Sequence, residues 1–232
     1  MMRRALPILC LIAAVGLAAR LALADAEERA ISLAEGQWDA AAWTPLRLPM
    51  QTHVRTFVQR PDCVGTNSFT EEEIRQGLDN VLLMTDSGLD EGEFEVVFRI
   101  GPEHGAAPGV FLSPALAGEE LEAGIAVFVA DYTMAVWMVG TDPETRATQY
   151  DHLVRLARWQ DPSVQHVLRC RYSKARAMVA LQVDDSDVVV LRFPDYQLNS
   201  RIGIWGCHGT CDFYSLTIRP EGTLPWSGAP PE

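Results

Sequence analysis

The sequence is short of positive charge. Its 19 lysines and arginines stand against 31 aspartates and glutamates, which gives a formal net charge of −12. Nucleic acids and anionic lipid surfaces repel a chain of this charge. We therefore expect neither as a partner.

Several common catalytic motifs are missing as well. The sequence contains no G-x-S-x-G elbow, no phosphate loop and no H-E-x-x-H pair. The commonest serine hydrolase, nucleotide-binding and zinc peptidase sites are therefore excluded. Internal repeats and long stretches of helical periodicity are also lacking. We expect no cofactor.

The longest apolar stretch stands at the N-terminus. Residues 5–19 follow two arginines and precede a small-residue run at 22–24 and the acidic Asp25. This order is typical of a secretory signal peptide, and the stretch is shorter than the ~20 residues that cross a bilayer. We therefore expect removal of residues 1–24, export to the periplasm or the cell exterior, and no membrane span in the mature chain. An uncleaved anchor is the alternative.

The chain is rich in short segments with alternating side chains. In residues 94–100 every second position is apolar, whereas Glu95 and Arg99 stand between them, as in a strand with one buried face. Other runs are apolar at nearly every position and predict strands covered on both faces. We expect an all-β fold, one antiparallel β-sandwich domain over residues 25–220. The main strand signals are at residues 94–100, 124–130, 133–139, 165–172, 177–183 and 187–193.

One short helix is predicted near the N-terminus, as a surface elaboration of the all-β fold. Thr70 and Glu73 have the spacing of a capping box, and Gly77 weakens the helix near its end. Residues 221–232 are rich in proline and predict an extended C-terminal tail.

Four cysteines follow the signal peptide, an even number that suits pairing in an oxidising compartment. Cys207 and Cys211 flank three residues between two strand-like runs, and a tight turn would bring their Cβ atoms within bridging distance. We expect this disulfide, with Cys63–Cys170 as its corollary. The alternative is a metal site with His208 as third ligand, but the local sequence offers no fourth ligand, and we expect no metal.

Three glutamates form one candidate catalytic set. Glu91, Glu93 and Glu95 occupy alternate positions and share a face if a strand begins that early. Paired carboxylates supply the nucleophile and the acid of retaining glycosidases. Gly92 indicates that the chain is still turning there, so we favour a solvated strand edge for the three glutamates.

Aromatic side chains form another candidate set, because the apolar C–H faces of sugar rings stack on them. We expect Trp205, beside a short turn, to line a cleft with Tyr132. Trp137 lies inside an all-apolar run and is expected in the core. His104 lies in a glycine-rich loop and is free to bind a ligand, whereas His166 lies in a strand and is expected to be structural. Further aromatic candidates are Tyr150 and Trp159.

The order of segments from about residue 80 to residue 220 resembles the 3-keto-disaccharide hydrolase domain family. The resemblance is carried by LLMTDSGLDEGEFEVVFRI, HGAAPGVFL, GIAVFVAD, RWQDPSVQHVLRCRY, LQVDDSDVVVLRF and, most specifically, RIGIWGCHGTCDFYSLTIRP. The family consists of concanavalin A-like jelly rolls in secreted bacterial proteins. The resemblance therefore implies a saccharide or glycoside held on a concave sheet.

Position by position, the resemblance implies catalytic roles for Arg99, Asp131 and His208. Arg99 would hold a hydroxyl or a developing negative charge, and the other two would share proton transfer. The family usually has a glutamate and a glutamine where this chain has Ala126 and Phe128, which cannot act as acid or base. Two hypotheses follow: a hydrolase of a keto-sugar glycoside, and a non-catalytic carbohydrate-binding or surface-interaction module.

Overall fold

The computed structural model describes residues 27–103, 105–130, 132–157 and 160–226. The predicted signal peptide lies outside the described residues, as do His104, Asp131 and Trp159.

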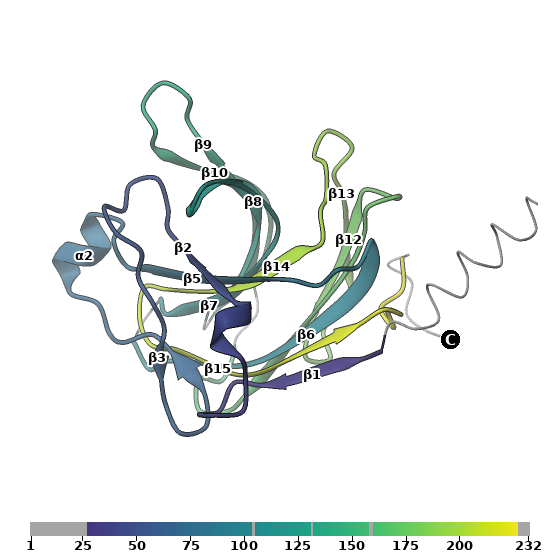
Figure 1. The fold of residues 1–232 in the computed structure, drawn as a ribbon, viewed down its shortest axis with the longest axis horizontal. Coiled ribbons are helices and arrows are strands. Elements are labelled where there is room, and N and C mark those ends of the chain that lie inside the picture. The colour runs from purple at the N-terminus through teal and green to yellow at the C-terminus, as the bar shows by residue number, and fades with distance from the viewer. Residues whose placement is uncertain (1–26, 104, 131, 158–159, 227–232) are drawn as a thin grey trace, which may run out of the picture.

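Two antiparallel sheets pack face to face in a β-sandwich (Figure 1). We name them after central strands, the β6 sheet and the β8 sheet. The β6 sheet runs β13 (Val189–Arg192), β12 (Met178–Val183), β11 (His166–Ser173), β6 (Glu91–Ile100), β15 (Cys211–Arg219), β4 (Val64–Gly65), β3 (Val58–Gln59), with β1 (Arg29–Ser32) paired to β15. The β8 sheet runs β10 (Thr148–Ala157), β9 (Thr133–Thr141), β8 (Glu120–Ala130), β7 (Ala107–Ala117), β14 (Arg201–Cys207), β5 (Asn80–Asp86), β2 (Thr44–Leu46). The arrangement confirms the predicted all-β antiparallel sandwich.

Alternation along the strands builds the interior between the sheets. In β6 the side chains of Phe94, Val96, Phe98 and Ile100 are each at most 2% exposed. They pack in one cluster with side chains of the β8 sheet, such as Ile125. Full burial of an apolar side chain of this size is worth roughly 1.5–3 kcal/mol, so this period of two determines which face of β6 points inward.

A second apolar cluster lies on the outer face of the β8 sheet. It explains why the strands of this sheet are apolar on both faces. Leu46 and Leu48 pack over it, and the backbone of Arg47 bonds to Glu119 and Leu121 at 3.0 and 2.9 Å. The segment around β2 therefore covers part of this face. Its other members include Leu82, Phe111, Ala126, Val139, Trp205 and Cys207.

The short helix forms where the capping pattern predicted it. In α2 (Glu71–Arg75) the Thr70 hydroxyl accepts a bond from the Glu73 backbone N–H at 3.2 Å, and the Thr70 N–H donates to the Glu73 carboxylate at 2.8 Å. Gly77 follows with φ of +67°, and a Cβ there would lie 2.4 Å from Met50 Sδ. The positive φ favours glycine at this turn, whereas the flexible Met50 side chain could move away from a Cβ. A second helical turn is η1 (Ala40–Ala42).

The disulfide prediction is wrong for this structure, since the four described cysteines are free and buried. The turn between Cys207 and Cys211 does not close a hairpin. It carries the chain from β14 in the β8 sheet to β15 in the β6 sheet. Cys207 consequently joins the outer cluster of the β8 sheet, whereas Cys211 joins the cluster between the sheets. Cys170, the expected partner of Cys63, also lies in the cluster between the sheets.

The described part of the chain contains no helix that is long and apolar enough to span a membrane.

Candidate functional site

A cavity of about 610 Å³ opens on the outer face of the β8 sheet, beside the area covered by the segment around β2. Strands β8, β9 and β10 curve, and their hairpin lies on the same side of the sandwich as α2 and β2 (Figure 1). Six strands of one sheet and the segment around α2 thus surround one hollow. Its lining residues are Met50, Ile74, Gly77, Asp79, Asn80, Gly105, Ala107, Phe128, Ala130, Thr133, Ala135, Trp137, Tyr150, His152, Arg155, Cys207 and His208.

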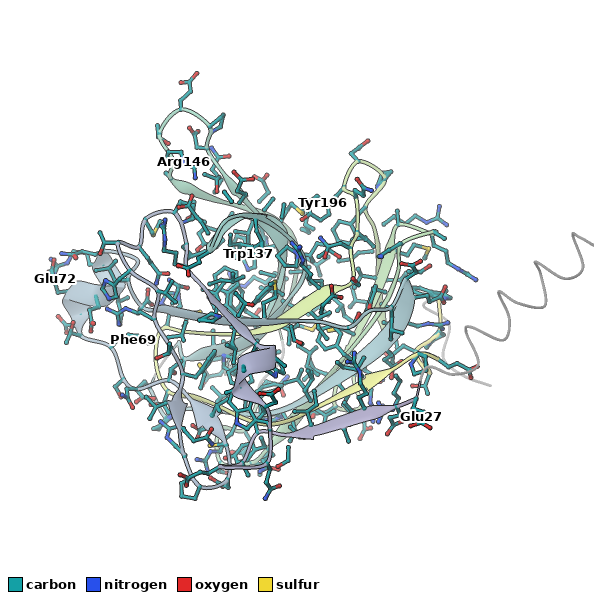
Figure 2. The ribbon with its side chains drawn as sticks, in the orientation of Figure 1. Glu27, Phe69, Glu72, Trp137, Arg146 and Tyr196 are labelled. Atoms are coloured by element: carbon teal, nitrogen blue, oxygen red, sulfur yellow. The ribbon has the colours of Figure 1, made fainter. Side chains whose placement is uncertain are left out.

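Strand register assembles one wall of the cavity from aromatic rings. Trp137 in β9 stands opposite His152 in β10, and the two rings are 4.5 Å apart between centroids. Tyr150 meets the Trp137 ring edge to face at 6.2 Å. Figure 2 shows Trp137 within the curve of β8, β9 and β10. The prediction that Trp137 belongs to the core is confirmed only in part: its side chain is half-buried against the outer cluster of the β8 sheet, and it also lines the cavity.

A β-bulge places Arg155 in the cavity. The register between β9 and β10 shifts between His152 and Val154. Regular alternation would have turned residue 154 to the same side as residue 152. Because of the bulge, Val154 packs against the core between the sheets, while both His152 and Arg155 line the cavity.

The polar end of the cavity is an Asp–His pair. The Asp79 side chain is 1% exposed, and its Oδ2 lies 2.6 Å from Nδ1 of His208. The same oxygen accepts the His208 backbone N–H at 3.1 Å, and Oδ1 accepts from the Asn80 amide at 3.2 Å. The hydrogen bond with Asp79 raises the pKa of His208 above its usual 6.5, against the opposing effect of burial. Half of the His208 side chain stays exposed to a ligand.

Tyr150, in β10, also lines the cavity with the Asp79–His208 pair. The residue is 40% exposed, yet burial of its hydroxyl among the cavity side chains raises its pKa, and the negative charge of Asp79 raises it further. The phenol therefore remains protonated at neutral pH and can donate a hydrogen bond.

Trp205 does not face the cavity, contrary to the sequence prediction. It is 0% exposed, and its indole N–H donates to Asn80 Oδ1 at 2.9 Å. Phe128 packs against it edge to face with 4.9 Å between centroids. Trp205 therefore packs behind the cavity residues Phe128 and Asn80 and offers no ring face to a ligand.

The predicted catalytic residues are not brought together among the described residues. His208 lines the cavity, but Arg99 lies in the β6 sheet, pairs with Asp212 at 2.8 Å and lines a separate hollow. Tyr132 is 60% exposed and is not among the cavity residues. Asp131 and His104 lie outside the described residues.

The three alternating glutamates share one face of β6, away from the cavity. The strand begins at Glu91, as their shared face requires. However, β6 lies inside its sheet and Glu93 is 1% exposed, so the interpretation as a solvated strand edge is wrong for that residue. The glutamates form cross-strand ion pairs rather than a catalytic set. Glu95 pairs with Arg169 and Arg219, and Glu91 pairs with Arg171, whereas the Glu93 carboxylate accepts the backbone N–H groups of Thr223 and Leu224.

His166 has the structural role predicted for it. It is 4% exposed, and its ring nitrogens lie 2.9 Å from an Asp184 carboxylate oxygen and 2.8 Å from the Asp161 carbonyl oxygen. No group of three or more His, Cys, Asp or Glu side chains in the described ranges is placed to hold a metal ion.

Sequence reasoning missed Asp79, His152 and Arg155. Asp79 lies in the part of the chain where the family resemblance had ended. In β10 the alternation of Tyr150 and His152 was a usable signal, but the bulge interrupts its period before Arg155.

Neither a family model nor a curated protein sequence matches the chain. The likeness to the 3-keto-disaccharide hydrolase family is thus not confirmed. Solved structures do match along most of the chain. The fold is a concanavalin A-like jelly roll. The sequence identities to these solved structures, given below, are so low that the likeness shows the fold alone.

Three of these jelly rolls serve as examples. Carbohydrate-binding module CBM66 from Bacillus subtilis has a TM-score of 0.54 and 11% identity, over 77% of this chain and 95% of that one. The exoplasmic/lumenal domain of VIP36 with Ca²⁺ and Man3GlcNAc bound has a TM-score of 0.55 and 13% identity, over 84% and 90%. The Crh5 transglycosylase in complex with NAG has a TM-score of 0.54 and 13% identity, over 83% of each chain.

Proposed function

We propose that this chain is an exported carbohydrate-binding protein that holds a saccharide in the cavity of the β8 sheet. The observation that carries the proposal is the pairing of an aromatic wall with a polar end. Trp137 and Tyr150 offer ring surface to the C–H face of a sugar, and the His208 ring and the Tyr150 hydroxyl offer polar groups to its hydroxyls.

Two further observations support the proposal. The solved jelly rolls similar to this chain include a carbohydrate-binding module and a glycan-bound lumenal domain. The N-terminal sequence has the order of a secretory signal peptide, and glycans are abundant where such proteins are exported.

The test is a binding titration against a panel of oligosaccharides with two matched variants. Trp137→Ala removes the ring from the cavity wall and should weaken binding at least about tenfold, or ~1.4 kcal/mol. Tyr132→Ala removes an exposed aromatic ring outside the cavity and should leave binding unchanged. Equal losses in the two variants, or a loss in Tyr132→Ala alone, would place the sugar elsewhere.

Binding is favoured over glycoside hydrolysis by the count of carboxylates. The usual glycosidases place two carboxyl groups about 5–9.5 Å apart across the scissile bond. Among the described lining residues Asp79 is the single carboxylate, and His208 and Asn80 already occupy its oxygens.

A second candidate function is hydrolysis of an oxidised disaccharide, in line with the sequence resemblance. One observation favours it: an imidazole held by a buried carboxylate is an arrangement suited to proton transfer. Incubating the protein with 3-keto and ordinary disaccharides would then release monosaccharides from the oxidised ones. The rate should fall at least about 100-fold in His208→Gln. No release by the unmodified protein from either class, with binding intact, would leave the binding function alone.

A further inference from the structure

The charges of the cavity differ in sign from those of the whole chain. The protein carries a net charge of −12. Among the described lining residues, however, Arg155, His152 and His208 bear cationic or protonatable groups, and Asp79 is the single acid. Asp79 is 1% exposed and is covered by His208 and Asn80, so a ligand meets Arg155 and the two imidazoles first.

Arg155 is placed to meet a ligand rather than to stabilise the fold. No described carboxylate lies within ion-pair distance of its guanidinium, whereas most of the arginines that the structure describes are paired, such as Arg146 with Glu120. The residue opposite Arg155 in β9 is Ala135, whose partner in β8 is the cavity residue Phe128. The small side chain of Ala135 leaves room for a ligand group between Arg155 and the Phe128 ring.

His208 adds a second donor to the cavity. Its Nδ1 faces Asp79, so Nε2 is the ring nitrogen left for a ligand. The Asp79 contact also raises the pKa of His208 and so favours the imidazolium, in which both ring nitrogens donate.

We infer that the cavity selects sugars that carry a carboxylate, that is uronate residues of acidic glycans, and that Arg155 binds the carboxylate. This inference rests on the proposed sugar-binding function and names its ligand class. The planar guanidinium matches a carboxylate with two parallel hydrogen bonds, and charge-assisted bonds of this kind are about twice as strong as neutral ones. A neutral sugar has no group that requires this cation. An acidic chain, in turn, needs a local cation to hold an acidic glycan against the repulsion of its other charges.

The test compares matched pairs of oligosaccharides that differ only in the group at C6. Glucuronate-, galacturonate- and mannuronate-containing oligosaccharides are titrated beside their neutral gluco, galacto and manno counterparts. We expect one uronate series to bind at least about tenfold more tightly than its neutral partner. We also expect this preference to shrink as salt is added.

Variants of Arg155 then assign the preference. Arg155→Gln should remove at least about tenfold of the affinity for the uronate and change that for the neutral sugar by less than about twofold. Arg155→Lys keeps the charge but loses the two-pronged geometry, and should recover only part of the affinity. Arg192→Gln, an exposed arginine of the β6 sheet, is the charge-matched control and should have no effect.

Three outcomes would overturn the inference. Equal binding of uronate and neutral sugars would remove the carboxylate preference but leave the proposed function standing. Equal losses for both sugars in Arg155→Gln would show a role in cavity shape instead of charge recognition. Absence of binding to every sugar of the panel would overturn the proposed function itself. Thermal unfolding of each variant confirms that it is folded.

Discussion

At the residue scale, the polar end of the cavity depends on one buried carboxylate. Asp79 contacts the ring and the backbone N–H of His208, and it lies 129 residues away in the sequence. His208 has a φ of +63°, in the left-handed region that few residues other than glycine adopt. The bond to its N–H therefore supports the conformation that turns the imidazole to the cavity.

The pKa of His208 offers a direct test of this pair. Asp79→Asn removes the charge that favours the imidazolium, so the pKa of His208 should fall below its value in the unmodified protein. Because the pair raises the folded-state pKa, its stabilisation is fully present below pH ~6.5 and disappears as pH rises through the folded-state pKa. NMR titration of the ring and unfolding at several pH values measure both effects.

The control for this prediction is His208→Gln. In that background Asp79→Asn should leave no pH-dependent difference in stability between pH ~6 and pH ~8. A pH-dependent difference that persists without the imidazole would assign it to another group.

At the element scale, two tryptophans on the same sheet face differ from the places expected for them: Trp205 is fully buried, and Trp137 is half-buried and lines the cavity. Trp137 in β9 and Trp205 in β14 both point to the outer face of the β8 sheet. Leu46 and Leu48 cover the part of this face that holds Trp205, and Phe128 closes over its ring. Trp137 packs only in part against this cluster, with the rings of His152 and Tyr150 beside it, and it lines the cavity. The difference comes from which segment lies above each strand, not from the strands themselves.

The two tryptophans should accordingly differ in stability effects. Trp205→Ala should lower the free energy of unfolding by about 3–5 kcal/mol, because it leaves a void in a packed cluster. Trp205→Phe should lower it by about 1–3 kcal/mol, because the buried Asn80 Oδ1 loses its donor. Trp137→Ala should cost less than Trp205→Ala, because the Trp137 ring is only half-buried and already faces the cavity on one side. Denaturant unfolding measures all three, and a larger loss for Trp137→Ala than for Trp205→Ala would reverse the assignment.

At the scale of the whole molecule, the connection after β14 decides several features together. It leads from the β8 sheet into the β6 sheet, which directs Cys207 and Cys211 into different apolar clusters. The separation of the sheets also keeps Arg99, on β6, out of the cavity that His208 lines.

The curvature of the β8 sheet acts at the same scale. Strand β10 at its edge contributes Tyr150, His152 and Arg155 to the cavity, while β14 and β5 contribute Cys207 and Asn80 from the opposite side. Residues of strands that are not hydrogen-bonded neighbours thus share one ligand space.

The sequence by itself determined the all-β class, the inward face of β6 and the capped helix at α2. Each of these follows from a local rule: a period of two along a strand, or a hydrogen bond between residues three apart. It also drew attention to His208, which does line the cavity.

Only the tertiary structure decided which sheet each strand joined, which part of the outer face was covered, and which residues met in the cavity. Alternation specifies that a side chain is on one face or the other, but it carries no information about what lies above that face. That depends on contacts between distant segments, such as the apolar cluster that Leu46 shares with Trp205 and the pairing of Asp79 with His208.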